Sequence, residues 1–226
     1  MVFVGQLQCA QLGRMTLYTR SFDVEAFVPD QQTLGILRLN RLESAVKKRQ
    51  AEFIAGRYVA KDALSDLGFA NDTAIPIGRN RSPLWPAGVV GSISHNHNTA
   101  VCVVGKSDSY GSLGIDVETI LEPSVTAEVL PLIATQSETV IFCPSQWNEQ
   151  SMATLLFSAK ESLFKALYPL VQHYLEFKDA ILTEIDDVQG TAQFTFSRHV
   201  TALCGLTECQ TFFRFTTNQV VTLTRL

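Results

Sequence analysis

The chain has 226 residues, of which 46% are hydrophobic and 18% charged, and its formal net charge is -4. An apolar content this high excludes a disordered chain, and the acidic balance argues against a protein built to bind nucleic-acid phosphates. The length suits one large domain or two small ones. We therefore expect a folded protein without a nucleic-acid partner.

The sequence also predicts a cytoplasmic protein with no membrane span. No stretch approaches the roughly 18 uninterrupted apolar residues that cross a bilayer, and the N-terminal segment lacks the basic leader and apolar core of a signal peptide. Five cysteines occur, none of them at CxxC spacing. That pattern favours free thiols over a disulfide framework or a zinc site. The five are Cys9, Cys102, Cys143, Cys204 and Cys209.

The first half of the chain combines short apolar runs with one long helical pattern. Breakers between the runs of residues 1–38 predict strands and loops. Helical spacing of apolar residues predicts a helix over 40–68, with Gly68 at its C-terminal cap. Residues 71–98 are rich in proline and glycine and are expected to be mostly loop.

Residues 100–104 read as a strand that belongs to the first half. The second half begins with a predicted strand over 113–117, and a short helix is expected within 124–138. A second long helix is predicted over 146–168, ending at Pro169 because proline cannot continue a helix.

Branched and aromatic residues make the tail, 179–226, β-rich. The order of elements is thus strands, long helix and strands in each half. We expect an α+β chain of two similar α/β subdomains, residues 1–110 and 111–226.

An acidic pair lies on the second predicted strand, in Gly114-Ile115-Asp116-Val117-Glu118. Side chains two residues apart share one face of a strand, so Asp116 and Glu118 project together while their neighbours face the other side. Two adjacent carboxylates repel each other unless a cation or a proton lies between them, and they suit a hard cation such as Mg²⁺. The alternative is a solvent-exposed strand face.

The second long helix carries Glu161 and Lys165 four residues apart, hence on one face. Such a pair is usually an ordinary surface ion pair. Glu161 could instead add a third carboxylate to the site of Asp116 and Glu118, where substrate phosphates and water would complete an octahedral Mg²⁺ shell.

The segment Gly91–Asn98 is expected to be a loop, and it supports three interpretations. Ser94 beside His95 suggests a hydrolase, but the chain has no GxSxG nucleophile elbow. His95 and His97 could bind a metal. Hydroxyl, imidazole and backbone N–H groups could also bind a phosphate.

Basic residues gather on the first long helix and in the proline-rich segment. Arg49 and Arg57 are eight residues apart, about 12 Å along the helix axis and about 80° around it, so both can reach one groove. In an acidic chain this gathering indicates an anionic ligand, although a solvated helix face is the alternative. The group comprises Lys47, Lys48, Arg49, Arg57, Arg79 and Arg81.

Together these residues resemble the 4'-phosphopantetheinyl transferases, particularly the larger monomeric kind of the enterobactin-synthetase type. The likeness covers the middle two-thirds of the chain. Its specific parts are the GIDVE and SAKES–FKA segments, preceded in the family's order by KRQAEFIAGR, RSPLWPAG and GSISH. It implies two similar subdomains forming a pseudo-dimer, the N-terminal one on the adenosine side of coenzyme A and the C-terminal one holding the metal.

The resemblance implies transfer of the phosphopantetheine arm of coenzyme A to a serine of an apo carrier protein, with release of adenosine 3',5'-bisphosphate. Siderophore, other non-ribosomal peptide and polyketide synthesis are the expected settings. The expected cofactor is Mg²⁺, with Mn²⁺ possible, and the enzyme is expected to be a monomer.

The resemblance also implies residue roles. It assigns the metal to Asp116, Glu118 and Glu161, and catalysis to Glu161 and Lys165, with Glu161 as the base directly or through a metal-bound water. The residues expected to bind coenzyme A are Arg49, Arg57, Arg81, Ser94, His95 and Lys160.

Two other classes of function stay open at this point. One is a metal-dependent hydrolase that uses His95, His97 and Asp116. The other is a non-catalytic module that binds coenzyme A or the carrier.

Overall fold

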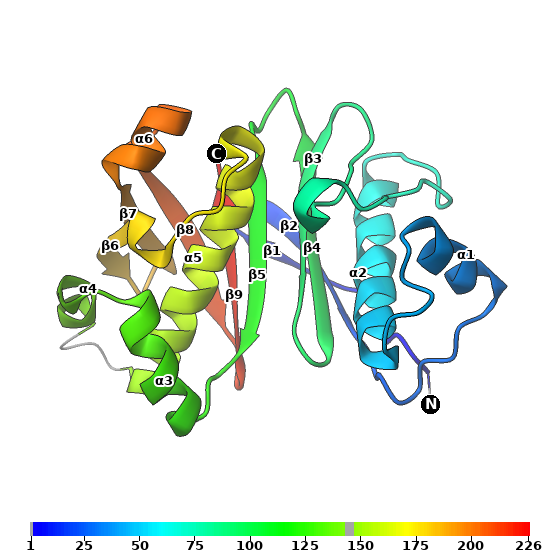
Figure 1. Ribbon diagram of the computed structural model, residues 1–226, viewed down its shortest axis with the longest axis horizontal. Coiled ribbons are helices and arrows are strands. Elements are labelled where there is room, and N and C mark those ends of the chain that lie inside the picture. The colour runs from blue at the N-terminus through cyan, green and yellow to red at the C-terminus, as the bar shows by residue number, and fades with distance from the viewer. Residues whose placement is uncertain (1, 143–146) are drawn as a thin grey trace. The chain divides into compact units, whose positions relative to one another are not determined.

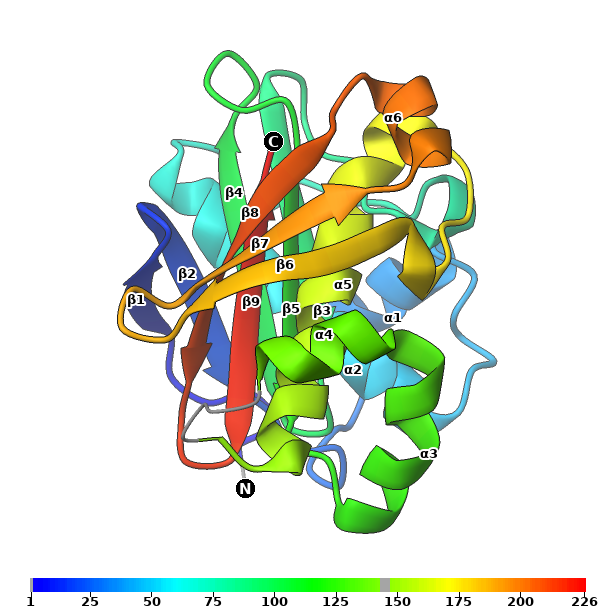
Figure 2. The same ribbon diagram turned by 90° about the vertical axis from the view of Figure 1, so that its left-hand side faces the viewer.

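The computed structural model describes residues 2–142 and 147–226. The chain divides into two compact units, Met1–Tyr110 (unit 1) and Gly111–Leu226 (unit 2). Each unit is an antiparallel sheet packed against one long helix, as Figures 1 and 2 show. The fold is therefore α+β with two similar halves, as the sequence predicts.

Unit 1 contains a four-stranded antiparallel sheet in the order β1-β2-β4-β3. Two hairpins, β1–β2 and β3–β4, join through the pairing of β2 with β4. The pairing of Ile93 with Cys102 and of His95 with Ala100 sets the register of β3, the edge strand on the second hairpin. The strands are β1 (Gln8–Leu12), β2 (Met15–Ser21), β3 (Val89–His95) and β4 (Thr99–Lys106).

Helix α2 covers this sheet and forms the core of unit 1 with it (Figure 1). Ala55, Val59 and Ala63 follow one another at helical spacing, are fully buried, and belong to the core cluster of β2 and β4. Gly68 has a positive φ of 88° just beyond the helix, which glycine adopts without strain. The helical segments are α1 (Gln31–Leu39), α2 (Lys47–Asp66) and the short η1 (Arg79–Arg81).

Unit 2 contains a five-stranded antiparallel sheet in the order β5-β9-β8-β7-β6. The first and last strands of the unit, β5 and β9, are paired, with Asp116 opposite Thr222 and Glu118 opposite Val220. The strands are β5 (Leu113–Thr119), β6 (Ala180–Asp186), β7 (Thr191–Phe196), β8 (Glu208–Phe215) and β9 (Gln219–Arg225).

Helix α5 packs along β5, β9 and β8, and its apolar side chains form the core of unit 2. Leu156, Leu163 and Leu167 are almost fully buried there, together with Phe194 of β7. The helical segments are α3 (Pro123–Ile133), α4 (Gln136–Ile141), α5 (Glu149–Val171), η2 (Phe177–Asp179) and α6 (Arg198–Cys204).

Several predicted boundaries are wrong in detail. The helix expected over 40–68 begins at Lys47, and the segment expected as a loop at Gly91–Asn98 forms most of strand β3. Helix α5 continues past Pro169 to Val171, because a proline lacks only its own backbone N–H donor and the helix ends two residues later. Helices α1 and α6 were not expected.

Within the described residues no helix is long and apolar enough to cross a membrane. Cys9, Cys102, Cys204 and Cys209 are free thiols. The remaining cysteine, Cys143, lies outside the described residues.

Candidate functional site

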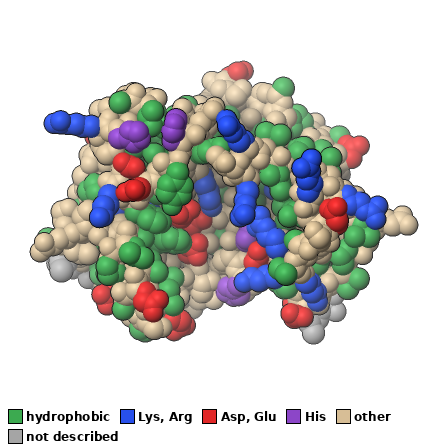
Figure 3. All heavy atoms as spheres, in the orientation of Figure 1, with side chains coloured by type: hydrophobic (Ala, Val, Ile, Leu, Met, Phe, Trp, Pro, Cys, Tyr) green, Lys and Arg blue, Asp and Glu red, His purple; other side chains and the backbone are tan. Residues whose placement is uncertain are grey.

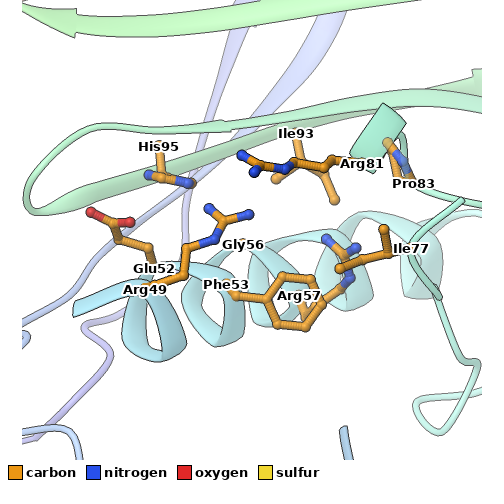
Figure 4. A pocket seen from close by; sticks show the side chains of 10 residues that line it. All are labelled: Arg49, Glu52, Phe53, Gly56, Arg57, Ile77, Arg81, Pro83, Ile93 and His95. Atoms are coloured by element: carbon orange, nitrogen blue, oxygen red, sulfur yellow. The ribbon is translucent and has the colours of Figure 1, made fainter. Parts of the chain in front are cut away.

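A pocket in unit 1 lies between α2, strand β3 and the segment that connects them (Figure 4). Residues of α2 line its floor at helical spacing, so their side chains share one face. His95 extends into it from the end of β3, and Arg81 from the connecting segment. The lining residues are Arg49, Glu52, Phe53, Gly56, Arg57, Ile77, Arg81, Pro83, Ile93 and His95.

Three arginines and a histidine thus meet a single acidic residue, Glu52, in this pocket. Glu52 also lies 3.9 Å from the Lys48 ammonium. On the face shown in Figure 3, Lys and Arg side chains gather over the part of unit 1 that contains α2. The pocket therefore carries an excess of positive charge in an acidic protein, which favours an anionic ligand.

Arg57 is the most deeply placed of these cations, with only 8% of its surface exposed. Its Nε donates to the Ile75 carbonyl at 2.7 Å, and its guanidinium lies 4.2 Å from the centre of the Phe53 ring. Burial, with a further contribution from nearby Arg49, lowers the Arg57 pKa to about 10. Among the residues the structure describes, no carboxylate forms an ion pair with it. An anion bound in the pocket would stabilise a buried cation of this kind.

The backbone around Arg81, whose side chain extends into the pocket, has an unusual conformation. Asn80 and Arg81 both have positive φ, 51° and 65°. Asparagine tolerates this region better than most residues, but arginine does not. We take the strain as a feature of the loop that presents the Arg81 side chain.

Ser94 does not line this pocket. Successive side chains of a strand point to opposite faces, and Ile93 and His95 occupy the pocket face of β3. Ser94 is buried on the other face. The structure thus does not bring Ser94 and His95 together in this pocket, and the role of Ser94 in coenzyme A binding stays a prediction.

The acidic residues gather in unit 2, between β5 and α5. Asp116 has 4% of its side chain exposed, and its Oδ1 accepts a hydrogen bond from the Lys165 ammonium at 2.7 Å. Lys165 Nζ also donates to the Ile115 carbonyl at 3.1 Å. As the alternation along β5 predicts, Ile115 and Val117 are fully buried on the opposite face of the strand from Asp116.

Electrostatic interactions connect the three carboxylates. Burial, together with the charge of Asp116, raises the pKa of Glu118 to about 8, and Lys165 opposes the rise. Burial is also the main cause that raises the pKa of Glu161, with a smaller contribution from Asp116. Desolvation and mutual repulsion thus make two of these carboxylates retain protons more strongly than usual. A bound cation would relieve both penalties.

The described residues contain no set of three His, Cys, Asp or Glu side chains arranged close enough to hold a metal ion. Within unit 2 that finding covers Asp116, Glu118 and Glu161. Instead, the Lys165 ammonium donates a hydrogen bond to Oδ1 of Asp116.

Lys160 does not reach this site. Its ammonium is fully buried and forms a 2.8 Å ion pair with Glu138 of α4. It also donates to the carbonyls of Ile133 at 2.7 Å and Phe177 at 2.9 Å. Burial lowers its pKa, and the hydrogen bond to Glu138 opposes that shift. The structure therefore places Lys160 away from both the basic pocket and the acidic cluster, and its role in coenzyme A binding stays a prediction.

Sequence reasoning missed several of these residues. The spacing of Arg49, Phe53 and Arg57 at four-residue intervals could have identified the pocket face of α2. Ile77 and Pro83 lie in the loop-rich segment, where no periodic signal exists. The partnership of Glu138 with Lys160 spans 22 positions and carries no local pattern.

Two family models match the chain. One, described as the 4'-phosphopantetheinyl transferase N-terminal domain, matches residues 38–105, which include the basic pocket. The other, described as the 4'-phosphopantetheinyl transferase superfamily, matches residues 112–223, which include the acidic cluster.

Named relatives agree with these models. Enterobactin synthase component D of Salmonella typhi is 38% identical over 151 residues, or 66% of this chain and 61% of that protein. The protein of the same name from Escherichia coli (strain K12) is 38% identical over 151 residues, or 67% and 70%. The 4'-phosphopantetheinyl transferase PptT of Mycobacterium tuberculosis is 35% identical over 154 residues, or 66% and 65%. The match thus spans less than two thirds of the Salmonella and Mycobacterium proteins. On these matches, the chain belongs to the 4'-phosphopantetheinyl transferase superfamily.

Proposed function

We propose that this protein transfers the 4'-phosphopantetheine arm of coenzyme A to a serine of an apo carrier protein. The serine oxygen forms a bond to the phosphorus that bears the pantetheine arm, and the bond from that phosphorus to the adenosine side breaks. Adenosine 3',5'-bisphosphate leaves, and the hydroxyl proton passes to a base. The observation that carries this proposal is the carboxylate–lysine cluster of β5 and α5, in a chain of this superfamily.

The basic pocket is the proposed site for the adenosine end of coenzyme A, including its 3'-phosphate. Arg49, Arg57 and Arg81 supply guanidinium groups that can bind phosphate oxygens with two hydrogen bonds each. His95 adds a further contact from β3. The buried, carboxylate-free position of Arg57 supports this assignment most directly.

Asp116, Glu118 and Glu161 are the residues that would hold a divalent cation, Mg²⁺ or Mn²⁺. Their chemistry fits, because hard oxygen ligands suit these ions, and because burial, with a smaller contribution from Asp116, raises the pKa values of Glu118 and Glu161. When bound, the cation would neutralise charge on the coenzyme A pyrophosphate.

Lys165 and Glu161 are the proposed catalytic residues. Lys165 is held by Asp116 and is partly exposed, so its ammonium can stabilise charge that develops on the leaving phosphate. Glu161 accepts the proton of the attacking serine, directly or through a water molecule. Its raised pKa brings it nearer the working range of a general base.

The direct test incubates the protein with coenzyme A, Mg²⁺ and a panel of apo carriers from siderophore, other non-ribosomal peptide, polyketide and fatty-acid synthesis. Intact-mass spectrometry then reports which carriers gain one phosphopantetheine group. We expect at least one carrier to gain it in a reaction that needs coenzyme A. A panel that stays unmodified in the presence of folded protein would contradict the proposal.

Arg57 offers a test of the coenzyme A site. We expect Arg57→Ala to weaken coenzyme A binding roughly 10- to 100-fold, since a charge-assisted contact contributes about 1.5–3 kcal/mol. Dephospho-coenzyme A, which lacks the 3'-phosphate, should lose much less. Isothermal titration with both ligands measures this, with Lys61→Ala, one turn further along α2, as the control. Equal losses for the two ligands would place Arg57 elsewhere in the site.

The carrier is proposed to dock on residues 119–148, of which 143–146 lie outside the described residues. Helix α3 begins at Pro123, shortly after Glu118, so a carrier bound here is near the acidic cluster in sequence and fold. Val125, Leu132 and Val140 expose apolar side chains on α3 and α4.

Replacing Leu132 with aspartate is expected to raise the KM for the carrier at least several-fold while the KM for coenzyme A stays constant. Val188→Asp, at an exposed turn of the same unit, is the matched control. An unchanged carrier KM for aspartate at Val125, Leu132 and Val140 would exclude this surface. Because one chain holds both units, we propose that the active protein is a monomer. We also propose that it works in the cytoplasm.

A further inference from the structure

Gly114 lies on β5 beneath α5, where no side chain fits. A Cβ atom at this position would lie 1.8 Å from the Ser162 carbonyl oxygen and 2.6 Å from the Ala166 backbone nitrogen. Both are backbone atoms of the helix, which a rotamer change cannot move. The helix therefore rests directly on the backbone of the strand that carries Asp116.

Beside this contact, two hydroxyl pairs join α5 to β9. Ser158 Oγ and Thr222 Oγ1 are 2.9 Å apart, and Ser162 Oγ and Thr224 Oγ1 are 3.1 Å apart. Thr222 Oγ1 also donates to the Ser158 carbonyl at 2.8 Å. All four residues are fully buried. Ser162 Oγ also donates to the Ala159 carbonyl at 2.9 Å, and Thr224 Oγ1 lies 2.7 Å from Thr211 Oγ1 of β8. The pairs therefore belong to a buried hydrogen-bond network that connects α5 to the sheet, and breaking such a network is costly.

The spacing of these pairs fixes the helix along its axis. Ser158 and Ser162 are four residues apart, about 6 Å along a helix, and Thr222 and Thr224 are two apart, about 6.7 Å along a strand. Both pairs can form together only in one register. A slide by one turn, about 5.4 Å, breaks at least one of them.

This register decides whether the acidic cluster exists. In the β5–β9 ladder Thr224 lies opposite Gly114, and Thr222 lies opposite Asp116. Lys165 follows Ser162 by less than one turn and reaches Asp116 Oδ1 at 2.7 Å. A displacement of the helix by a few ångströms would separate that pair and move Glu161 from Glu118.

We propose that Gly114 and the Ser158–Thr222 and Ser162–Thr224 pairs are positioning residues of the active site. They fix the position of α5 along β5 and β9. In that position Lys165 contacts Asp116, and Glu161 lies near Glu118. Their link to catalysis rests on the proposed function, whereas their effect on the Lys165–Asp116 pair does not.

Thr224→Val is the main test variant, because valine has nearly the same shape but loses the hydroxyl. Thr211→Val, which removes the other hydrogen-bond partner of Thr224 but leaves Ser162, is its comparison and should keep the wild-type behaviour. Thr224→Ser restores the hydroxyl and is the rescue variant. Gly114→Ala is a more severe change, because the added methyl group would collide with the helix backbone. If that variant fails to fold, Thr224→Val still tests the proposal. Val200→Ala is the control, because Val200 is a fully buried core residue of the same unit on α6.

The first measurement is a double-mutant cycle of Asp116→Asn and Lys165→Met, in which urea unfolding gives the free energy of unfolding of each variant. We expect a favourable coupling between the two residues in the wild-type and Val200→Ala backgrounds and its loss in the Thr224→Val background. Coupling that survives in Thr224→Val would overturn the proposal. This readout needs no transferase activity.

The second measurement separates kcat from KM. We expect Thr224→Val to lower kcat roughly 10- to 100-fold, the effect of a small misplacement of catalytic groups, with an unchanged KM for coenzyme A. Thr224→Ser should recover most of the rate, and Val200→Ala should keep it. Equal kcat for Thr224→Val and wild type would contradict the positioning role. A wild-type protein without activity would overturn the proposed function and leave the cycle to decide the positioning role.

Discussion

Replacing Asp116 with asparagine is expected to lower kcat for carrier modification at least 100-fold. The substitution removes the carboxylate that holds Lys165 and that would share in binding the cation. Steady-state rates with a carrier and coenzyme A at saturation measure the effect. The fold should persist, because loss of the Lys165 ion pair is offset by relief of the repulsion between Asp116 and Glu118.

Asp187→Asn is the matched control, since Asp187 is an exposed carboxylate in the turn after β6 of the same unit. It should keep the wild-type rate. Circular dichroism of both variants checks that they are folded. A folded Asp116→Asn protein with undiminished kcat in Mg²⁺ would remove Asp116 from the catalytic machinery and with it the assignment of the acidic cluster.

Replacing Lys160 with methionine is expected to destabilise unit 2 by about 3–5 kcal/mol, because it leaves the buried Glu138 carboxylate without its partner. For a chain of this size that corresponds to a fall in melting temperature of roughly 6–20 °C. Thermal unfolding measures it, and Lys178→Met, at an exposed lysine of η2, should change it little.

A second substitution separates the structural role of Lys160 from phosphate binding. In Lys160→Met/Glu138→Gln the buried negative charge is gone, while the glutamine oxygen can still accept from the Leu182 N–H that Glu138 Oε1 binds at 2.9 Å. Much of the lost stability should return, with the KM for coenzyme A unchanged at a temperature where the protein is folded. A raised KM with normal stability would support Lys160 as a ligand of coenzyme A.

The sequence predicted the parts of the fold that local pattern determines. Apolar spacing predicted the body of α2, and Gly68 ends that helix region with the expected positive φ. The alternation around Asp116 predicted which face of β5 carries the carboxylates. These predictions hold because the local signal and the tertiary packing favour the same conformation.

Where the prediction failed, the local signal was weak or misleading. Helix α1 is short and contains Gly35, although Asp30 and Thr33 form a capping box that could have indicated its start. The serine and glycine content of Gly91–His95 is typical of a loop, yet pairing with β4 makes this segment a strand.

The candidate site divides in the same way. The residue types and order of the motifs indicated the basic pocket residues and the three carboxylates. Sequence could not distinguish Lys160 from Lys165, two lysines on one helix. Their different roles depend on what packs against each face: Glu138 and two carbonyls against Lys160, and β5 against Lys165. Such partners lie far away along the chain.

The most direct test of the central claim measures both products of one reaction. With coenzyme A, Mg²⁺ and an accepted apo carrier, we predict one molecule of adenosine 3',5'-bisphosphate released for each carrier that gains phosphopantetheine. A carrier with its acceptor serine changed to alanine should give neither product. Release of adenosine 3',5'-bisphosphate without carrier modification, or equal release with the alanine carrier, would contradict the proposed transfer.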